Sequence, residues 1–205
     1  VLRLSSSGSA DAVVARALGI PRETVRDWRR SAAAGKRHGT KQDEACPTCS
    51  PGGPFDKAAY AYLLGMYLGD GCLSEHPRGV FKLRVSLDAR QPGIVEECSR
   101  TIATVSSGRR VGRQAGRGCI IVGAYWKHWR CLFPQHGPGR KHFRRIELAA
   151  CQIDIAQAFP DRLLRGLIHA DGCRVANRVG HAVYPRYLFS NRSRDILRIF
   201  CNACE

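Results

Sequence analysis

The spacing of apolar residues predicts alternating helices and strands over most of the chain. Residues 55–71 are apolar on nearly all sides, which is typical of a buried helix. Apolar and polar residues alternate over 80–87, which predicts a strand with one buried face. We expect a helix over 92–105, a basic turn over 109–113 and another strand over 119–126. The first half then has the order α-β-β-α-β-β-α.

The pattern of the first helix returns later in the chain. Residues 63–72 and 164–173 share a leucine, two glycines, an aspartate and a cysteine at the same offsets when Asp70 is superposed on Asp171. After the second copy we expect strands near 174–179 and 183–190 and a helix from Ser193. The repeat predicts an α+β fold with two similar halves related by a pseudo-twofold axis.

Small residues recur four apart in both copies of the repeat. They are Gly65 and Gly69 in the first copy, and Gly166 and Ala170 in the second. Small residues one helical turn apart let two helix backbones approach closely. We therefore expect the two helices to pack against each other through these four residues.

The repeated aspartates are the candidate chemical groups. Asp70 and Asp171 each precede a glycine, which suits a left-handed residue just past a helix end. Both carboxylates would lie at the negative ends of helix dipoles, and close together they would repel each other. A divalent cation resolves this repulsion, since Mg²⁺ takes carboxylate oxygens and keeps waters for chemistry. The alternative is two capping turns without an ion.

The first 31 residues predict a helix-turn-helix. Gly19 and Ile20 separate two short helical patterns, and Pro21 opens the second. Residues 17–28 resemble the short helix-turn-helix of resolvase-type and transposase-type proteins, with a basic outer face that suits DNA. The alternative is an ordinary helical hairpin with a solvated basic face. The candidate DNA contacts are Arg22, Thr24, Arg26, Arg29 and Arg30.

Residues 32–54 are small, polar and rich in glycine and proline, which predicts a linker to a domain over 55–205. Cys46 and Cys49 within it have the spacing of a pair of Zn²⁺ ligands. A structural zinc site needs four ligands, and an exposed pair without metal is the alternative. The candidate partners are Cys201, Cys204 and His38.

Composition and charge indicate a polyanionic partner. The chain has 205 residues, is 44% hydrophobic and carries a net charge of +16, mostly from arginine. The arginine guanidinium pairs with phosphates and base edges through two parallel hydrogen bonds. The ten cysteines include several in core-like segments, and there is no signal-peptide pattern or long apolar run. We therefore expect reduced cysteines in a cytoplasmic protein without membrane contact.

The two motif copies resemble those of the LAGLIDADG homing endonuclease family, and the resemblance covers roughly 55–205. It implies a saddle of antiparallel strands astride double-stranded DNA, with the motif helices at the pseudo-symmetric interface of a monomer. It also implies that Asp70 and Asp171 bind Mg²⁺ and support hydrolysis of one phosphodiester on each strand. Against the family's length, the second half is short by about a strand pair and a helix. We expect a chain cut at both ends.

Two basic segments accompany the motifs. The outer face of 80–87 carries Lys82, Arg84 and Ser86, and such a face can lie along a nucleic-acid groove. Residues 125–145 interleave basic and aromatic side chains, which suits phosphate contact and base stacking. A solvated loop is one alternative there, and a metal site is another. Its candidate metal ligands are His128, Cys131, His136 and His142, and its candidates for stabilising charge on a cleaved phosphate are Lys127, Arg140 and Lys141.

The sequence supports two main hypotheses of function. The first is a Mg²⁺-dependent, site-specific DNA endonuclease in which Asp70 and Asp171 hold the ions. The second is a DNA-binding transcriptional regulator that keeps the same fold without cleavage. Retention of both acids favours the enzyme, whereas the fused helix-turn-helix favours the regulator. A recombinase accessory factor is a third, weaker hypothesis.

Overall fold

The computed structural model describes residues 10–19, 21–33 and 55–205. They belong to two compact units, Val1–Glu44 and Ala45–Glu205. In the first unit, helices α2 (Asp11–Leu18) and α3 (Arg22–Ala33) share a small core of Val14, Ala15 and Val25. Gly19 ends α2 with a φ of 64°, a left-handed conformation that glycine adopts without strain.

The second unit is an α+β structure with antiparallel sheets, as the periodicity predicts. Its first seven elements follow the expected order, α-β-β-α-β-β-α, apart from a short 3₁₀ turn. In chain order its elements are α4 (Lys57–Gly69), β1 (Gly71–His76), η1 (Pro77–Gly79), β2 (Val80–Asp88), α5 (Pro92–Val105), β3 (Gly112–Ala115), β4 (Cys119–Trp126), α6 (Trp129–Leu132), η2 (Lys141–Phe143), α7 (Ala150–Ala158), α8 (Pro160–Asp171), β5 (Gly172–Val179), β6 (Ala182–Phe189) and α9 (Arg194–Cys204).

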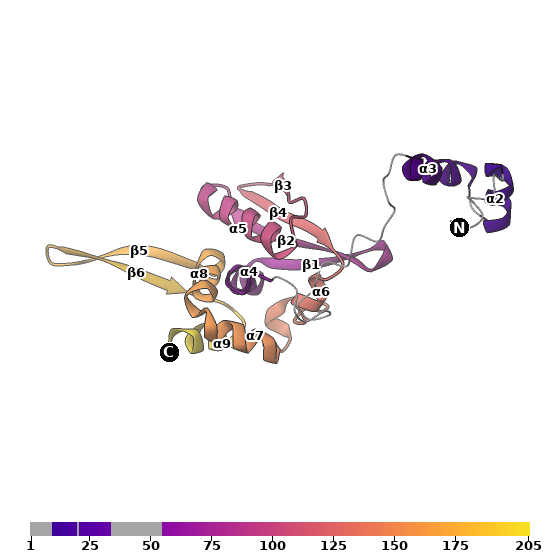
Figure 1. Ribbon diagram of the computed structural model, residues 1–205. Coiled ribbons are helices and arrows are strands. Elements are labelled where there is room, and N and C mark those ends of the chain that lie inside the picture. The colour runs from indigo at the N-terminus through magenta and orange to yellow at the C-terminus, as the bar shows by residue number, and fades with distance from the viewer. Residues whose placement is uncertain (1–9, 20, 34–54) are drawn as a thin grey trace. The chain divides into compact units, whose positions relative to one another are not determined.

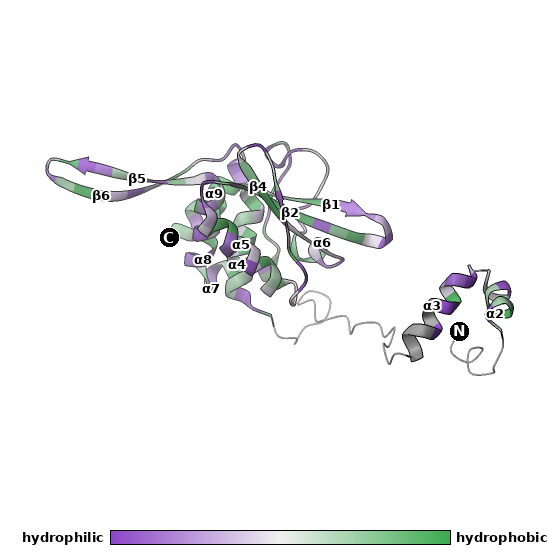
Figure 2. Ribbon diagram, turned by 90° about the horizontal axis from the view of Figure 1, so that it is seen from above, coloured by the Kyte–Doolittle hydropathy of each residue, from purple (hydrophilic) through white to green (hydrophobic). Residues whose placement is uncertain are grey.

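Two separate sheets are formed. Strands pair in the order β1-β2-β4-β3 in the first sheet, while β5 and β6 form a two-stranded hairpin. Helix α4 lies between the four-stranded sheet and α8 (Figure 1). The hairpin extends away from the helices, and apolar and polar residues are mixed along it (Figure 2). Within the described parts of the chain, no helix is long and apolar enough to cross a membrane.

The hydrophobic core surrounds α4. Every residue from Tyr60 to Leu68 is buried, because sheet, helices and loop cover this helix on all sides. On β2 the buried and outward residues alternate, with Phe81, Leu83, Val85 and Leu87 turned to the core. Helix α5 adds Val95, Cys98, Ile102 and Val105 to the same core.

The aromatic residues after β4 are mostly part of this core, so the expectation that they stack on nucleic-acid bases is wrong for three of them. Trp126, Trp129 and Phe133 are at most 3% exposed. The Phe133 ring stacks on Tyr67 with 4.2 Å between ring centroids, and the Trp129 Nε1 donates to the Ala124 carbonyl at 3.0 Å. The interleaved pattern reflects a segment that folds over α4, with basic residues left at the surface.

Local sequence does not give the bounds of three of these elements. Strand β1 lacks β-branched residues and follows α4 directly, and it is stabilised by pairing with β2 along its whole length. Strand β3 begins inside the predicted basic turn and is held by β4. Helix α7 is anchored by the buried Gln152, whose Nε2 donates to the Tyr60 hydroxyl at 2.8 Å and to the Leu132 carbonyl at 3.0 Å. In each case tertiary contacts outweigh local propensity.

Candidate functional site

Helices α4 and α8 meet with their backbones in direct contact. A methyl group added at Gly65 would lie 2.5 Å from the Leu163 carbonyl oxygen and 2.7 Å from the Leu167 nitrogen. One added at Gly166 would overlap the Tyr62 carbonyl oxygen and lie 3.0 Å from the Met66 nitrogen. A methyl group added at Gly69 would likewise overlap the Cβ of Ala170. The four predicted small residues therefore all lie at the crossing, where no larger side chain fits.

The crossing brings the two aspartates to one end of the helix pair. Asp70 is the residue that ends α4, and Asp171 is the last residue of α8. A methyl group at Gly69 would lie 2.8 Å from Asp171 Oδ2, so the second carboxylate lies against the end of the first helix. Mutual Coulomb repulsion contributes to a raised pKa at Asp70.

The glycines after the aspartates have a different role from the predicted one. Neither is left-handed: Gly172 has φ −107° and ψ 173°, and Gly71 is not among the glycines with positive φ. Each instead starts a strand that turns back over its own helix. A methyl group would lie 2.5 Å from the Tyr67 Cα at Gly71, and 2.7 Å from the Ile168 Cα at Gly172. Glycine is needed at both positions because the strand lies so close to the helix backbone that a side chain would not fit, and not because φ is positive.

Asp171 is held from two sides. The Asn191 Nδ2 donates to Asp171 Oδ2 at 2.6 Å, and the Asn191 Oδ1 accepts from the Ser193 amide at 2.8 Å. The Ser190 amide donates to the Asp171 carbonyl at 3.4 Å. Burial raises the pKa of Asp171, while Asn191 and Lys141 oppose the rise. Asn191 thus fixes one carboxylate oxygen and leaves the other available, a role that no sequence pattern had indicated.

Lys141 lies at the end of α4, beside both acids. Its ammonium donates to the carbonyls of Tyr67, Leu68 and Gly69, at 3.0 Å for Leu68 and 2.7 Å for Gly69. These carbonyls have no partner within the helix, and a cation there is favoured by the helix dipole. All three donors of the ammonium are used in this way. Lys141 therefore orders the segment that carries Asp70, and its charge reaches the carboxylates through space.

The pKa values of these groups reflect burial and mutual charge. Burial first, and then Asp171, raise the pKa of Asp70 to about 6, and Lys141 opposes the rise. Burial lowers the pKa of Lys141 to about 8, against the effect of Asp171 and Asp70. At pH 7, Asp70 is therefore mostly ionised and Lys141 mostly protonated. Perturbed values of this kind are typical of functional sites.

A basic groove opens beside the acids. Its lining includes Ser86 and Cys72 from the sheet, together with Asp70, Lys141 and Asp171. Arginines surround the rest of it: Arg140, Arg144 and Arg192. Arg144 Nη1 donates to the carbonyls of Gly137 and Gly139, at 2.9 Å for Gly139, and so shapes the loop that forms one wall. Of the predicted loop residues, the charge-stabilising candidates Arg140 and Lys141 and the metal-ligand candidates His136 and His142 thus lie at the groove.

Lys127 lies elsewhere, so its proposed role beside the acids is not supported. Gly71, next to Asp70, pairs with Val85, which pairs with Val122. Lys127 follows the opposite end of β4, five residues beyond Val122, or about 16 Å along the strand. It does not line the groove. Its position in a loop rich in basic residues gave no signal of this separation.

The outer face of β2 carries the predicted polar residues. Lys82, Arg84 and Ser86 point away from the core, and the Lys82 Nζ lies 5.1 Å from the centroid of the Tyr125 ring. The Arg84 Nε is buried without a hydrogen-bond partner in the part of the chain that the structure describes. An unpaired, buried guanidinium N–H on a basic sheet is suited to donate a hydrogen bond to an anion.

In the first unit, the outer face of α3 is partly used by the unit itself. Arg22 and Arg26 are exposed and Thr24 is half-buried. Arg29 forms an ion pair with Asp11, at 3.1 Å between Nη1 and Oδ1, which joins the two helices. Arg30 belongs to α3, and its side chain is outside the described part of the structure. Among the candidates whose side chains the structure describes, Arg22 and Arg26 are therefore the most accessible.

The zinc hypothesis is not tested, because Cys46, Cys49 and His38 lie outside the described residues. The candidate partners Cys201 and Cys204 are exposed on α9. Within the described ranges, no three histidine, cysteine or acidic residues are arranged to hold a metal ion. His128, Cys131, His136 and His142 therefore do not form a metal site, although the His128 Nδ1 lies 3.9 Å from the Cys131 sulfur.

A polar network on the other side of the crossing joins three helices. Glu97 of α5 accepts two hydrogen bonds from Arg165 of α8, at 2.7 and 2.8 Å, and lies 4.0 Å from the His169 Nδ1. The same His169 nitrogen lies 3.0 Å from the hydroxyl of Tyr62 on α4. Paired charges and hydrogen bonds thus fix α5 against the two crossing helices.

We predict that Glu97→Gln lowers the free energy of unfolding at pH 7 by about 1 kcal/mol, since the pair with Arg165 is partly exposed. Arg165 holds the pKa of Glu97 below its ordinary value of 4.5. The carboxylate therefore contributes stability above pH 4.5, and this contribution is lost as pH falls through the lowered pKa. Urea unfolding of both proteins at pH 7 and pH 3 should show the difference shrink at pH 3. An equal difference at both pH values would contradict the assignment.

Comparison with known proteins adds little to these observations. No protein-family model matches the chain, and no curated protein matches its sequence. One solved structure, from a study of the structures and dynamics of mesophilic variants of the homing endonuclease I-DmoI, is 14% identical. That match covers 72% of this chain and 70% of the other, with a TM-score of 0.46. A likeness at this level carries no inference, so a function has to be supported by the site itself.

Proposed function

We propose that this chain is a sequence-specific DNA-binding protein of the homing endonuclease type, which hydrolyses phosphodiester bonds in both DNA strands with Mg²⁺. The observation that carries this proposal is the meeting of Asp70 and Asp171 at one end of the α4–α8 crossing. Burial and the nearby Asp171 raise the pKa of Asp70. Two close carboxylates beside a basic groove favour a cation and an anionic substrate.

The residues present fit Mg²⁺. Asp70 and Asp171 offer carboxylate oxygens, and Mg²⁺ in proteins is often held by one or two carboxylates, waters and substrate phosphate. The free oxygen of Asp171, left by the hydrogen bond from Asn191, is suited to this role. When bound, the metal would supply an activated water and stabilisation of charge on the phosphate oxygens.

The other residues of the site bind and orient. Lys141 holds the end of α4 and adds a positive charge beside the acids, which favours the approach of a phosphate. Asn191 keeps the Asp171 carboxylate in one orientation. Arg140 and Arg192 line the groove, where their guanidinium groups suit phosphate oxygens. These roles need only ordinary protonation states at pH 7.

The outer face of β2 is proposed as the surface that contacts the DNA backbone. We predict that Lys82→Ala combined with Arg84→Ala weakens binding to all DNA sequences alike. The slope of log K against log salt concentration should fall in magnitude by about 2, since each lost phosphate contact removes about 0.9. Fluorescence anisotropy over a series of salt concentrations measures both effects.

Arg100→Ala is the matched control for that double variant. Arg100 is an exposed cation on α5, in the helical layer behind the sheet. Arg100→Ala should leave both the DNA affinity and the slope of log K against log salt concentration unchanged, once the loss of one positive charge is allowed for. If Arg100→Ala reduced the slope as much per residue as the β2 variant, the DNA would not contact this strand face.

The proposed function is tested by selecting bound sites from a random DNA pool and incubating the selected duplex with the protein and Mg²⁺. We expect both strands to be cut within the bound site. Selection of a defined site without any strand cleavage in Mg²⁺ or Mn²⁺ would contradict the endonuclease. It would favour the second candidate function.

That second candidate is a DNA-binding regulator on the same fold. It is favoured by Lys141, whose three donors are all occupied by backbone carbonyls and are not free to contact a scissile phosphate. The two-helix unit with exposed Arg22 and Arg26 also suits a regulator. The cleavage assay separates the two functions, because both require binding and only one requires the acids.

A further inference from the structure

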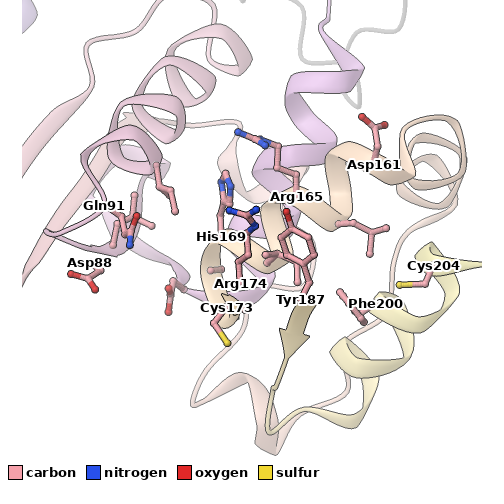
Figure 3. A pocket seen from close by; sticks show the side chains of 17 residues that line it. Asp88, Gln91, Asp161, Arg165, His169, Cys173, Arg174, Tyr187, Phe200 and Cys204 are labelled. Carbon is pink, nitrogen blue, oxygen red and sulfur yellow. The ribbon is translucent and has the colours of Figure 1, made fainter. Parts of the chain in front are cut away.

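A second cavity, distinct from the basic groove, also borders Asp70. It is an open pocket lined by α8, α9, the start of α5, the end of β2 and the base of the β5–β6 hairpin (Figure 3), and its volume is about 920 Å³. Figure 3 shows Arg165, His169, Arg174 and Tyr187 gathered in its middle. A cavity of this size matches the usual range of small-molecule sites.

On the helix, the two halves of the repeat differ at the positions that face this cavity. Superposing Asp70 on Asp171 places Leu64 on Arg165 and Leu68 on His169. Both leucines are fully buried. Both of their counterparts line the cavity. The second copy of the repeat therefore has two polar, hydrogen-bonding side chains at the positions where the first copy has core leucines.

The β1–β2 and β5–β6 hairpins also differ in this way, with apolar residues in the first and polar residues at the matching places in the second. Leu73 and Leu83 are directly opposite each other in the β1–β2 register and are at most 8% exposed. Arg174 and Tyr187 hold the equivalent places, directly opposite each other in the β5–β6 register. Four apolar core residues of the first half thus correspond to four polar side chains in the second half. All four of these polar side chains line one cavity. Scattered surface substitutions would not converge in this way.

The polar groups in the middle of the cavity have donors to spare. Arg165 uses its Nε and Nη2 on Glu97, which leaves its Nη1 free of that pair. The Arg174 guanidinium has no hydrogen bond or ion pair within the described ranges. His169 has one nitrogen near Tyr62 and the other ring nitrogen available. Several donors without acceptors favour an anion.

Two of the three carboxylates that line the cavity are paired with arginines. Asp88 accepts hydrogen bonds from Arg90 at 2.8 to 3.1 Å, and Figure 3 shows it at one edge. Asp161, at the other edge, is 3.5 Å from Arg162. Asp70 also borders the cavity and lies beside Lys141. The unpaired charge in the middle is therefore that of Arg174.

Part of the wall is apolar. Ile94, Leu164, Ile168 and Phe200 line the same cavity. An inorganic anion alone would leave this surface exposed to water, whereas an aromatic or aliphatic group would cover it. The site therefore combines a cationic middle with a hydrophobic side.

We propose that this cavity binds a small organic phosphate monoester, with its phosphate held by Arg174, Tyr187 and His169. The donors come from a strand, the opposite strand and a helix, so they approach from different directions. Such an arrangement suits the three oxygens of a tetrahedral phosphate better than the two of a planar carboxylate. The organic part lies against Ile168 and Phe200.

The proposal is tested by isothermal titration calorimetry of the full chain with phenyl phosphate, inorganic phosphate and benzoate. We expect phenyl phosphate to bind one per chain, and more tightly than either other probe. Arg174→Leu and Tyr187→Leu, which introduce the residues of the first half, should each weaken phenyl phosphate binding by about tenfold or more. Arg174→Gln tests the same loss with a polar side chain, in case leucine perturbs the fold.

Arg178→Leu is the matched control, since Arg178 lies further along β5 and does not line the cavity. It should bind phenyl phosphate like the unaltered chain. The proposal is overturned if the unaltered chain does not bind phenyl phosphate, or if Arg174→Gln binds it equally well. Equal binding of inorganic phosphate would overturn the role of the apolar wall, and tighter binding of benzoate would overturn the preference for phosphate.

Discussion

Gly166→Ala should destabilise the protein more than any other single methyl addition to the described helices. We expect the free energy of unfolding to fall by about 3 kcal/mol, because the new methyl group would overlap backbone atoms of α4. The Tyr62 carbonyl and the Met66 nitrogen lie within a helix that is buried on all sides, so neither can move away without disturbing the core. Urea unfolding followed by circular dichroism measures the change.

Gly93→Ala is the matched control for this prediction. Gly93 lies in the first turn of α5, and a methyl group there would meet no atom within 4 Å. Alanine restricts the unfolded chain and favours helix, so this variant should be more stable by about 0.5 kcal/mol. If both variants changed stability equally, the α4–α8 contact would not be as close as the structure has it.

Asp70→Asn and Asp171→Asn should each reduce Mg²⁺-dependent cutting by about 1,000-fold or more, or about 4 kcal/mol of transition-state stabilisation. An amide is a poor ligand for Mg²⁺ and carries no charge to offset the cation. DNA binding should persist or become tighter, because each change removes a negative charge next to a basic groove. Single-turnover cleavage and anisotropy on the selected site give the two readouts.

Asp88→Asn serves as the control for the acid variants. Asp88 ends β2, and its carboxylate is paired with Arg90 at the surface. Its substitution should leave the cleavage rate within about twofold, the change expected of a surface residue away from the chemistry. An Asp88→Asn defect as large as that of Asp70→Asn would mean that general loss of acidic charge, and not the acid pair, limits cleavage.

Much of the fold could be predicted because its periodicity is strong. Helix α5 and strand β4 have the predicted bounds, and β2 extends one residue beyond its predicted end. The meeting of Asp70 and Asp171 could be anticipated from small residues at matching offsets, since only such residues permit backbone contact. Local pattern was informative wherever one face of an element is buried.

The parts that could not be predicted depend on distant contacts. Lys141 caps α4 from a position 72 residues beyond Gly69, and no motif marks it among the basic residues of its loop. Asn191 reaches Asp171 only because β5 and β6 pair in one register. The glycines after the acids do not have the predicted role, since a strand folding back over its helix requires space and not positive φ.

The sequence repeat itself carries a signal of the second cavity. The alignment that identifies the aspartates also places Arg165 and His169 on Leu64 and Leu68. A change from core leucine to a charged or polar residue within a repeat indicates that the two halves no longer enclose the same kind of space. The structure then locates the cavity that these residues line.

The most direct test of the acid pair is binding of Mn²⁺ to the complex of the full chain with its selected DNA, followed by electron paramagnetic resonance. The DNA alone and the complexes of Asp70→Asn, Asp171→Asn and Asp88→Asn are titrated in parallel. The unaltered and Asp88→Asn complexes should bind Mn²⁺ beyond the amount bound by DNA, and Asp70→Asn and Asp171→Asn should lose this excess. Equal excess binding in all four complexes would contradict a metal site at Asp70 and Asp171.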